Sequence, residues 1–368
     1  DWHEARLAID SVTGMIEAST DSTIMTRAQA EVLYWTLKVT TRQNDSEGAA
    51  AAARVAEQLA SVALQDAEID PSTRVTAVLS LATYAAFYQS SDRALALMDE
   101  IRALIPEVDP ETAERAGLIR GTVSIRMAKW DEGEHEFLTA LGRASQRNDV
   151  VQQAGLWNNL ACSALEQGDW ERFEAWARKV EEIQICDTLD THMLLTLNRA
   201  NACFYQGKPK DADSLFRETL AWARSSGSLE FVPEILSCIG LIALQLGEVQ
   251  TATRTWKELL ETEPKQRLGP QELFKYEWFR AYMEEKFRDE GALERLLVAT
   301  QEQANLDLLS HYKLAWLGIL IFGDGFSRRN NQSAREARQN LFENRLGWFA
   351  GFAQRWLRSV NAKTSFAS

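Results

Sequence analysis

The chain has 368 residues, and its 53 acidic residues outnumber 40 Lys and Arg to give a net charge of −13. Because phosphate binding needs a basic surface, this charge disfavours a nucleic-acid partner for this segment. No apolar run approaches the roughly 18–20 residues of a membrane span. The charged opening DWHEARLAID is also unlike a signal peptide. We therefore expect a cytoplasmic protein with no membrane partner.

The first 24 residues contain an apolar stripe with no capping residue before it. The members of the stripe recur every three or four positions: Trp2, Ala5, Ile9, Val12 and Ile16. This spacing is typical of an amphipathic helix. We interpret the helix as the second of a hairpin whose first helix is absent, which would make the chain a fragment of something longer. The alternatives are an atypical capping helix or a trimmed tag.

Two more helices are expected before a regular pattern begins. Residues 26–41 carry apolar residues at helical spacing and end at the turn-rich stretch RQNDSEG, and alanines 49–53 open the next helix. The stretch DPSTR at 70–74 then starts a further helix, with Ser72 as its expected N-cap. Residues 1–69 are therefore predicted to form N-terminal helical hairpins.

From residue 70 to 305 the sequence pattern of a hairpin of two helices recurs six times, every 39 or 40 residues. The equivalent turn positions are Gln89, Ala128, Gly168, Gly207, Gly247 and Phe287. Five residues after each turn the side chain is small in five of six cases: Ala94, Gly133, Phe173, Ala212, Ala252 and Ala292. A fixed period with small residues at helix crossings is typical of a helical solenoid.

Three stretches carry a resemblance to a known repeat family: WNNLACSA, ANACFYQGKPKDADSLF and ILSCIGLIALQLGEVQTATRTW. They resemble the tetratricopeptide pattern W-x2-L-G-x2-Y, a Gly turn and A-x3-F. The resemblance implies an all-α, right-handed superhelical solenoid of antiparallel hairpins, in which the first helix of each pair lines a concave face. The long repeat resembles the superhelical sensor region of large bacterial signal-transduction ATPases that activate transcription, of which the maltose regulon activator is the type.

Residues 306–368 leave the register and are predicted to be capping helices. The stretch Leu308–Phe322 should form the most hydrophobic helix, and residues 323–333 (GDGFSRRNNQS) should form a loop. Residues 332–356 are expected to be one helix, with its aromatic residues on helical spacing. Because a solenoid end must be covered, we interpret most of this helix as a cap.

No catalytic or cofactor motif is found. The sequence has no phosphate loop and no G-x-G-x2-G, and its four histidines lack metal-ligand spacing. The four cysteines show no C-x2-C pair and are interpreted as small buried residues in a reducing compartment: Cys162, Cys186, Cys203 and Cys238. We therefore predict a protein that is not an enzyme and needs no cofactor or metal.

Counting back from the turns identifies polar and aromatic side chains expected to face the groove. The candidate binding residues are Arg115, Asn158, Asn159, Asn198, Asn201, Glu234, Glu277 and Trp278. An Asn side chain both donates and accepts, so it can bracket an extended peptide backbone or a polar small molecule. The alternatives are that the asparagines cap or cross-link neighbouring helices and that Trp278 is a core residue.

These features predict a non-catalytic binding module, the sensor or interaction domain of a larger bacterial regulatory protein. Its partner would be a protein, a peptide or a small polar ligand in the concave groove, and self-association is a further option. A stand-alone scaffold for assembling proteins is the first alternative. The second alternative is an enzyme whose site is built from helix faces without a recognisable motif.

Overall fold

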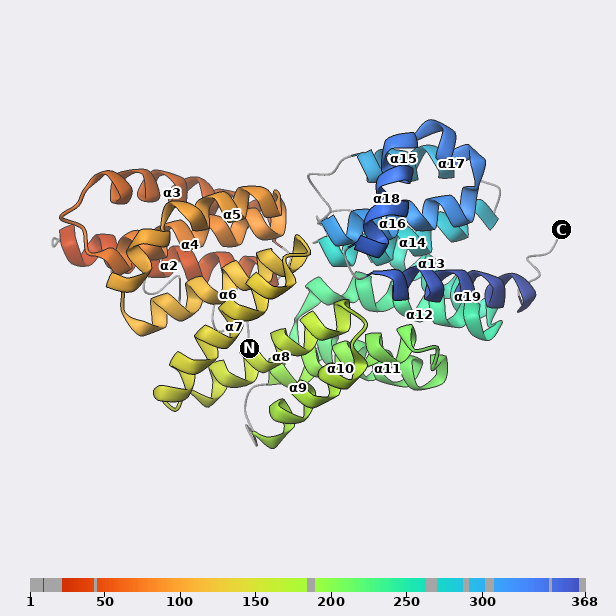
Figure 1. Ribbon diagram of the computed structural model, residues 1–368, viewed down its shortest axis with the longest axis horizontal. Coiled ribbons are helices and arrows are strands. Elements are labelled where there is room, and N and C mark those ends of the chain that lie inside the picture. Colours follow the sequence, from red (N-terminus) through yellow and green to blue (C-terminus); the bar gives the residue numbers. More distant parts are fainter. Residues whose placement is uncertain are drawn as a thin grey trace. The chain divides into compact units, whose positions relative to one another are not determined.

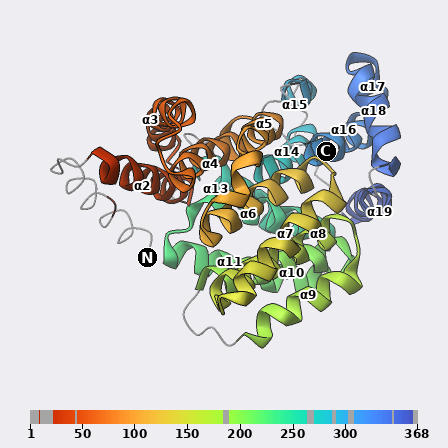
Figure 2. The ribbon, with the colours of Figure 1, turned by 60° about the vertical axis from the view of Figure 1, so that its left-hand side comes forward.

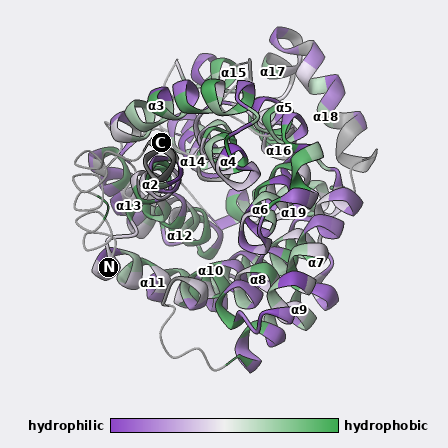
Figure 3. Cartoon of the chain, turned by 90° about the vertical axis from the view of Figure 1, so that its left-hand side faces the viewer, coloured by the Kyte–Doolittle hydropathy of each residue, from purple (hydrophilic) through white to green (hydrophobic). Residues whose placement is uncertain are grey.

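A computed structural model describes Ile9 and residues 22–42, 45–183, 189–262, 270–286, 291–301, 308–343 and 346–363. Within these residues every regular element is a helix, so the predicted all-α class is confirmed (Figure 1). Most helices carry both hydrophilic and hydrophobic residues along their length (Figure 3). None of the described helices is long and apolar enough to span a membrane. The stripe expected in residues 1–24 lies almost wholly outside the described residues.

The chain divides into two compact units, which we call unit 1 and unit 2. Unit 1 comprises Asp1–Leu156 and Ser225–Glu230, and unit 2 comprises Trp157–Arg224 and Phe231–Ser368. The division predicted from the repeat register, at residues 69 and 305, stays a prediction.

Unit 1 contains six α-helices and the beginning of a seventh among its described residues. They are α2 (Ser22–Arg42), α3 (Ser46–Gln65), α4 (Pro71–Tyr88), α5 (Ser91–Glu100), η1 (Arg102–Glu107), α6 (Pro110–Arg126), α7 (Trp130–Gln146) and the first part of α8 (Val150–Glu166). Connections of two or three residues join α4 to α5 and α6 to α7, and such short links place successive helices side by side and antiparallel.

Unit 2 is also built largely of helical hairpins, in which a first helix is joined by a short turn to a second (Figure 2). Beyond the rest of α8, its described helices are α9 (Trp170–Glu182), α10 (Leu189–Tyr205), α11 (Pro209–Ser226), α12 (Val232–Leu246), α13 (Val249–Thr262), α14 (Pro270–Lys286), α15 (Ala292–Gln301), α16 (Leu308–Phe322), α17 (Asp324–Arg329), α18 (Asn331–Glu343) and α19 (Gly347–Lys363). The last two residues of α11 and most of the short η2 (Leu229–Phe231), which precedes α12, belong to unit 1. The helices α8, α10, α12, α14 and α16 each precede a turn. We call the side of unit 2 that they form the first-helix face.

The predicted turn positions coincide with helix ends wherever the structure describes them. Gly168, Gly207 and Gly247 have φ of +71°, +77° and +85°, and Ala128 adopts the same left-handed region at +58°. At all four turns the next N–H donates to the carbonyl five residues earlier, the bond that closes a Schellman motif. Glycine favours this backbone conformation because it has no Cβ to collide with the carbonyl. Phe287 lies outside the described residues.

The predicted N-cap at Ser72 is wrong. Asp70 caps α4 by accepting a hydrogen bond from the Thr73 N–H at 3.0 Å, while the Ser72 hydroxyl accepts one from the Asp109 N–H at 3.1 Å. In both Asp70-Pro71 and Asp109-Pro110 the aspartate precedes a proline at the first helical position. Proline is favoured there because that position has no intrahelical partner for an N–H.

The C-terminal region matches the prediction in α16 and departs from it afterwards. The helix α16 spans Leu308–Phe322 as expected, but the predicted loop at 323–333 is wrong because α17 and the start of α18 occupy it. The single helix expected over 332–356 is also wrong, since α18 ends at Glu343 and α19 begins at Gly347.

The last helix, α19, packs along the first-helix face of unit 2. Its Phe352 ring lies 5.1 Å from the Phe204 ring on α10, and its Trp356 ring lies 4.9 Å from the Trp278 ring on α14. The Trp356 indole N–H donates to the Leu241 carbonyl on α12 at 3.2 Å. Aromatic side chains from one helix therefore join the first helices of three successive hairpins.

Candidate binding site

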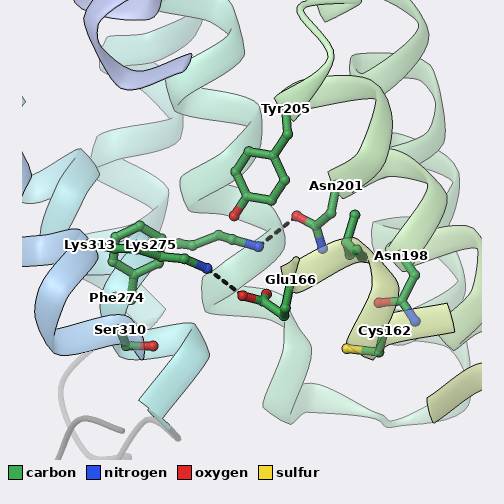
Figure 4. Close-up of a pocket in the computed structure, with 10 residues that line it drawn as sticks. Cys162, Glu166, Asn198, Asn201, Tyr205, Phe274, Lys275, Ser310 and Lys313 are labelled. Carbon is green, nitrogen blue, oxygen red and sulfur yellow. Dashed lines mark hydrogen bonds and ion pairs between the residues drawn. The ribbon is translucent and has the colours of Figure 1, made fainter. Parts of the chain in front are cut away.

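A polar pocket lies on the first-helix face of unit 2, beside the N-terminal end of α19 (Figure 4). Its lining comes from α8, α10, α14 and α16 and consists of Cys162, Leu165, Glu166, Asn198, Asn201, Tyr205, Phe274, Lys275, Ser310 and Lys313. Within α8 and α10 these residues recur every three or four positions, so they project from one side of each helix. The open space between them has room for about one water molecule.

Lys275 is the first of two buried cations in this pocket. Its ammonium group donates to the Asn201 side-chain oxygen at 2.6 Å and to the Glu234 carboxylate at 2.5 Å. The side chains of Lys275 and Glu234 are each only 6% exposed. Burial by itself would lower the pKa of Lys275, whereas the neighbouring Glu234 charge raises it. The second effect, with smaller contributions from other groups, prevails, so the pKa of Lys275 lies well above its usual value. Lys275 therefore carries a positive charge throughout the neutral range.

Lys313 is the second buried cation. It forms an ion pair with Glu166, and their side chains are 4% and 10% exposed. The ammonium group also lies 5.5 Å from the Phe349 ring centre and 5.8 Å from the Trp348 ring centre, within range of cation–π attraction. This ion pair joins α16 to α8, whose residues stand 147 positions apart in the chain.

Asn158 and Asn198 join two neighbouring first helices. The Asn198 side-chain N–H donates to the Asn158 oxygen at 3.1 Å, and Asn158 is 5% exposed. In this structure the two asparagines therefore cross-link neighbouring helices, which is one of the alternatives considered from the sequence. A single bond uses only part of what an Asn side chain offers, because each can take part in up to four hydrogen bonds.

The thiol and phenol of the pocket are poor sources of catalytic anions. Burial raises the pKa of Cys162 to about 12, and the nearby Glu166 charge adds to this shift. Burial likewise raises the pKa of Tyr205 above its usual value. Neither group ionises appreciably near neutral pH. In the part of the chain that the structure describes, no cluster of three or more His, Cys, Asp and Glu side chains could hold a metal ion.

The other predicted site residues lie elsewhere. Arg115 belongs to unit 1, where it pairs with Glu31 at 2.7 Å and stacks 4.9 Å from the Tyr34 ring centre. Glu277 is buried and pairs with Arg280 on its own helix. Neither these residues nor the half-buried Asn159 line the polar pocket.

Trp278 is a core residue, because its side chain is fully buried. Its ring packs against several aromatic neighbours: Phe204, Phe274, Phe349, Phe352 and Trp356. The alternative that Trp278 is a core residue therefore holds, and its ring has no face open to a ligand.

Sequence reasoning missed the charged residues Glu166, Lys275 and Lys313. One signal was present for Lys313, since it is the single Lys, Arg, Asp or Glu in the hydrophobic stretch LLSHYKLAWLGILIF. A lysine is rarely buried without a partner, so its position implied a distant carboxylate. Nothing local identified Glu166 as that partner.

No protein-family model matches the sequence, and no curated protein matches it significantly. Solved structures similar to it include two that share much of its length. The first is a Rap protein complexed with competence and sporulation factor, at 13% identity and a TM-score of 0.59, covering 91% of this chain and 99% of that chain. The second is NprR in complex with its cognate peptide NprX, at 14% identity and a TM-score of 0.52, covering 78% of this chain and 87% of that chain.

The chain has a tetratricopeptide-type helical-repeat fold. The all-α helical-repeat class, predicted from the repeat period and from the tetratricopeptide resemblance, is thereby confirmed. At 13% and 14% identity the likeness concerns the fold alone.

Proposed function

We propose that this protein is a non-catalytic regulator that binds an extended peptide on the first-helix face of unit 2. The observation that carries the proposal is the group of asparagines on that face, namely Asn158, Asn198 and Asn201. Two proteins of similar fold support it, since one was solved with competence and sporulation factor and the other with its cognate peptide.

The asparagines suit a peptide backbone better than a folded protein surface. An extended chain presents unpaired N–H and C=O groups along its length, and a primary amide offers a donor and an acceptor to match them. Asn198 and Asn201 stand three residues apart on α10 and so share one side of the helix, with Asn158 one helix away. Backbone contacts of this kind give affinity with little dependence on side-chain sequence.

Ligand entry requires rearrangement, because the open space in the pocket has room for only about one water molecule. The ion pairs and the Asn158–Asn198 bond would have to open for a peptide to reach the asparagines. A ligand that binds only the open arrangement shifts the population towards it. Such a shift could be read by another domain, as expected for a regulator.

Affinity selection tests this proposal. The immobilised protein is exposed to a pool of random hexapeptides, and enriched peptides are identified by mass spectrometry and measured by fluorescence anisotropy. Asn158→Ala combined with Asn201→Ala should weaken binding at least ten-fold, about 1.4 kcal/mol. Gln354→Ala, an exposed amide on α19, should leave the affinity unchanged. Failure to enrich any peptide, or full affinity in the folded double variant, refutes the proposal.

The regulator could be the sensor domain of a larger protein or a stand-alone scaffold. The 39–40-residue repeat length favours the sensor, through its resemblance to transcription-activating ATPases. A scaffold would spread its affinity over large surfaces, so partner capture would survive Asn158→Ala with Asn201→Ala. Sequencing the full reading frame separates the two, since a flanking ATPase or helix-turn-helix domain supports the sensor.

A further inference from the structure

We propose that the outward side of α19 is a docking surface for an acidic helix of a partner protein, whose carboxylates Arg355 and Arg358 bind. We call this side the basic face of α19, and it consists of Gly351, Arg355, Arg358 and Ala362. None of these residues lines the polar pocket, so the inference goes beyond the proposed peptide site and does not depend on it.

The basic face lies opposite the side of α19 that packs in the core. Phe349, Phe352 and Trp356 are buried among the helices of unit 2. The residues of the basic face follow one another at steps of four, three and four positions, so they share the other side of the helix. Arg355 and Arg358 are exposed there. One side of α19 therefore holds the helix in place, and the other side is available to a partner.

The two arginines lack the carboxylate that other exposed arginines of the chain have. Arg329, for example, is exposed on α17 and pairs with Glu294. Among the residues that the structure describes, no Asp or Glu forms an ion pair with Arg355 or Arg358. The sequence gives the reason, since residues 344–368 contain four Lys and Arg but no Asp or Glu. A locally positive surface therefore stands in a chain whose net charge is −13.

Arginine is well suited to bind the carboxylates of a partner. The planar guanidinium group can donate two parallel N–H bonds to one carboxylate, and such charge-assisted bonds are stronger than neutral ones. Arg355 and Arg358 stand three residues apart, which places their Cβ atoms about 5–6 Å from each other. Two carboxylates one turn apart on a partner helix have a matching separation. Each arginine can therefore take one of them.

The spacing of the basic face favours a helix as the occupant. Steps of three and four residues are those at which two packed helices meet. Gly351 and Ala362 have short side chains, so they let the partner helix approach at both ends of the face. Gly351 also leaves room for Arg355, whose guanidinium nitrogen Nη1 lies 3.3 Å from the position that a Cβ on Gly351 would take. The guanidinium group therefore lies along the helix, across the basic face.

Two other anionic partners suit α19 less well. A helix that lies on a membrane inserts its apolar side, but Phe352 and Trp356 on that side pack against α10 and α14. A nucleic acid needs a long basic stripe, whereas this face offers two arginines. An acidic helix needs to touch only the basic face, and charges more than about 10 Å away are largely screened at 0.1 M salt.

Affinity selection from helical peptides tests the inference. The pool contains alanine-based peptides of about 20 residues, long enough to be helical, in which Glu, Gln, Lys and Leu are mixed along one side. We expect the enriched peptides to carry Glu at steps of three and four residues, and to lose affinity when Gln replaces Glu or when the salt concentration is raised to 1 M. Enrichment of peptides without Glu, or of none, overturns the inference.

Matched variants of the protein locate the binding surface. Arg355→Gln combined with Arg358→Gln should weaken the enriched peptides at least five-fold. The control is Arg93→Gln combined with Arg102→Gln, which removes two positive charges from exposed positions on α5 and η1 and should leave the affinity unchanged. Circular dichroism checks that both variants fold. Equal affinities of the two double variants overturn the inference, because the peptides then respond to overall charge or bind elsewhere.

Two further measurements separate this surface from other sites and other partners. Binding of the enriched peptides should survive Asn158→Ala with Asn201→Ala, and its loss there would place them at the proposed peptide site instead. A single-stranded RNA oligonucleotide and phosphatidylserine vesicles serve as the other anions. If either binds more tightly than the peptides, and loses that binding with Arg355→Gln and Arg358→Gln, the basic face serves that class of partner and the inference is wrong.

Discussion

The buried charges on the first-helix face of unit 2 meet partners from other hairpins. Lys275 on α14 pairs with Glu234 on α12, and Lys313 on α16 pairs with Glu166 on α8. Lysine and glutamate are seldom buried without such partners, because transfer from water to a low-dielectric interior is costly. Apolar side chains at these positions would stabilise the core without this cost. The presence of charged residues there therefore supports a role in binding.

His311 gives a prediction at the residue scale. The side chain is 3% exposed, and burial lowers its pKa below the usual value, with a smaller opposing effect from the Glu336 charge. The unfolded chain therefore binds this proton more readily than the folded one. Stability contributed by neutral His311 is present above pH about 6.5 and is lost as the pH falls below it.

We expect the melting temperature to fall more for the wild type than for His311→Gln when the pH is lowered from 7.5 to 5.5. Differential scanning calorimetry at both pH values measures the difference. His192→Gln, at an exposed position on α10, serves as the control and should behave as the wild type does. An equal fall for His311→Gln and the wild type would show that His311 does not carry the effect.

At the scale of single helices, glycines set how closely first helices approach. A Cβ on Gly240 of α12 would collide with the ring of Phe279 on α14. In α7, by contrast, Gly142 is exposed, and a Cβ there would project into open space. Both glycines lie inside helices, so alanine improves the helix propensity equally at the two positions.

Gly240→Ala should destabilise the protein by about 1–3 kcal/mol, because the clash with Phe279 outweighs the gain in propensity. Gly142→Ala should stabilise it by about 0.5–1 kcal/mol. Urea unfolding followed by circular dichroism measures both changes. A stabilising effect of Gly240→Ala would mean that α12 and α14 are not in the close contact described.

The helix α19 shows how an element with a clear local pattern can have an unforeseen position. The spacing of its aromatic residues predicts a helix, and its expected role is a terminal cap. In the structure they reach α10, α12 and α14, and the Trp348 indole N–H donates to the Glu166 carbonyl on α8 at 3.1 Å. The same helix therefore builds part of the core and borders the polar pocket.

At the scale of the whole chain, the Lys313–Glu166 pair links positions 147 residues apart. Glu166→Gln should lower the free energy of unfolding by about 3 kcal/mol, since Lys313 is left buried without its carboxylate. Combining it with Lys313→Met should recover much of this loss, because both charges are then absent. Urea unfolding of the two single variants and the double variant gives the coupling. Additive losses would mean that the two side chains do not interact.

The sequence by itself determined the repeat class, its turns and the helix α16, but not α17 or the break between α18 and α19. Glycine at three turn positions and a 39–40-residue period are local signals, since backbone conformation and helix faces depend on residues a few positions apart. Asn158, Asn198 and Asn201 could be assigned to one face for the same reason.

The tertiary structure alone decided which side chains meet on that face. The pairing of Lys313 with Glu166, the burial of Trp278 and the position of α19 depend on how distant hairpins pack. Spacing along the chain shows which way a side chain points from its helix and carries no information about the helix that it will face. Ion pairs and aromatic contacts between elements far apart in sequence are therefore settled by packing.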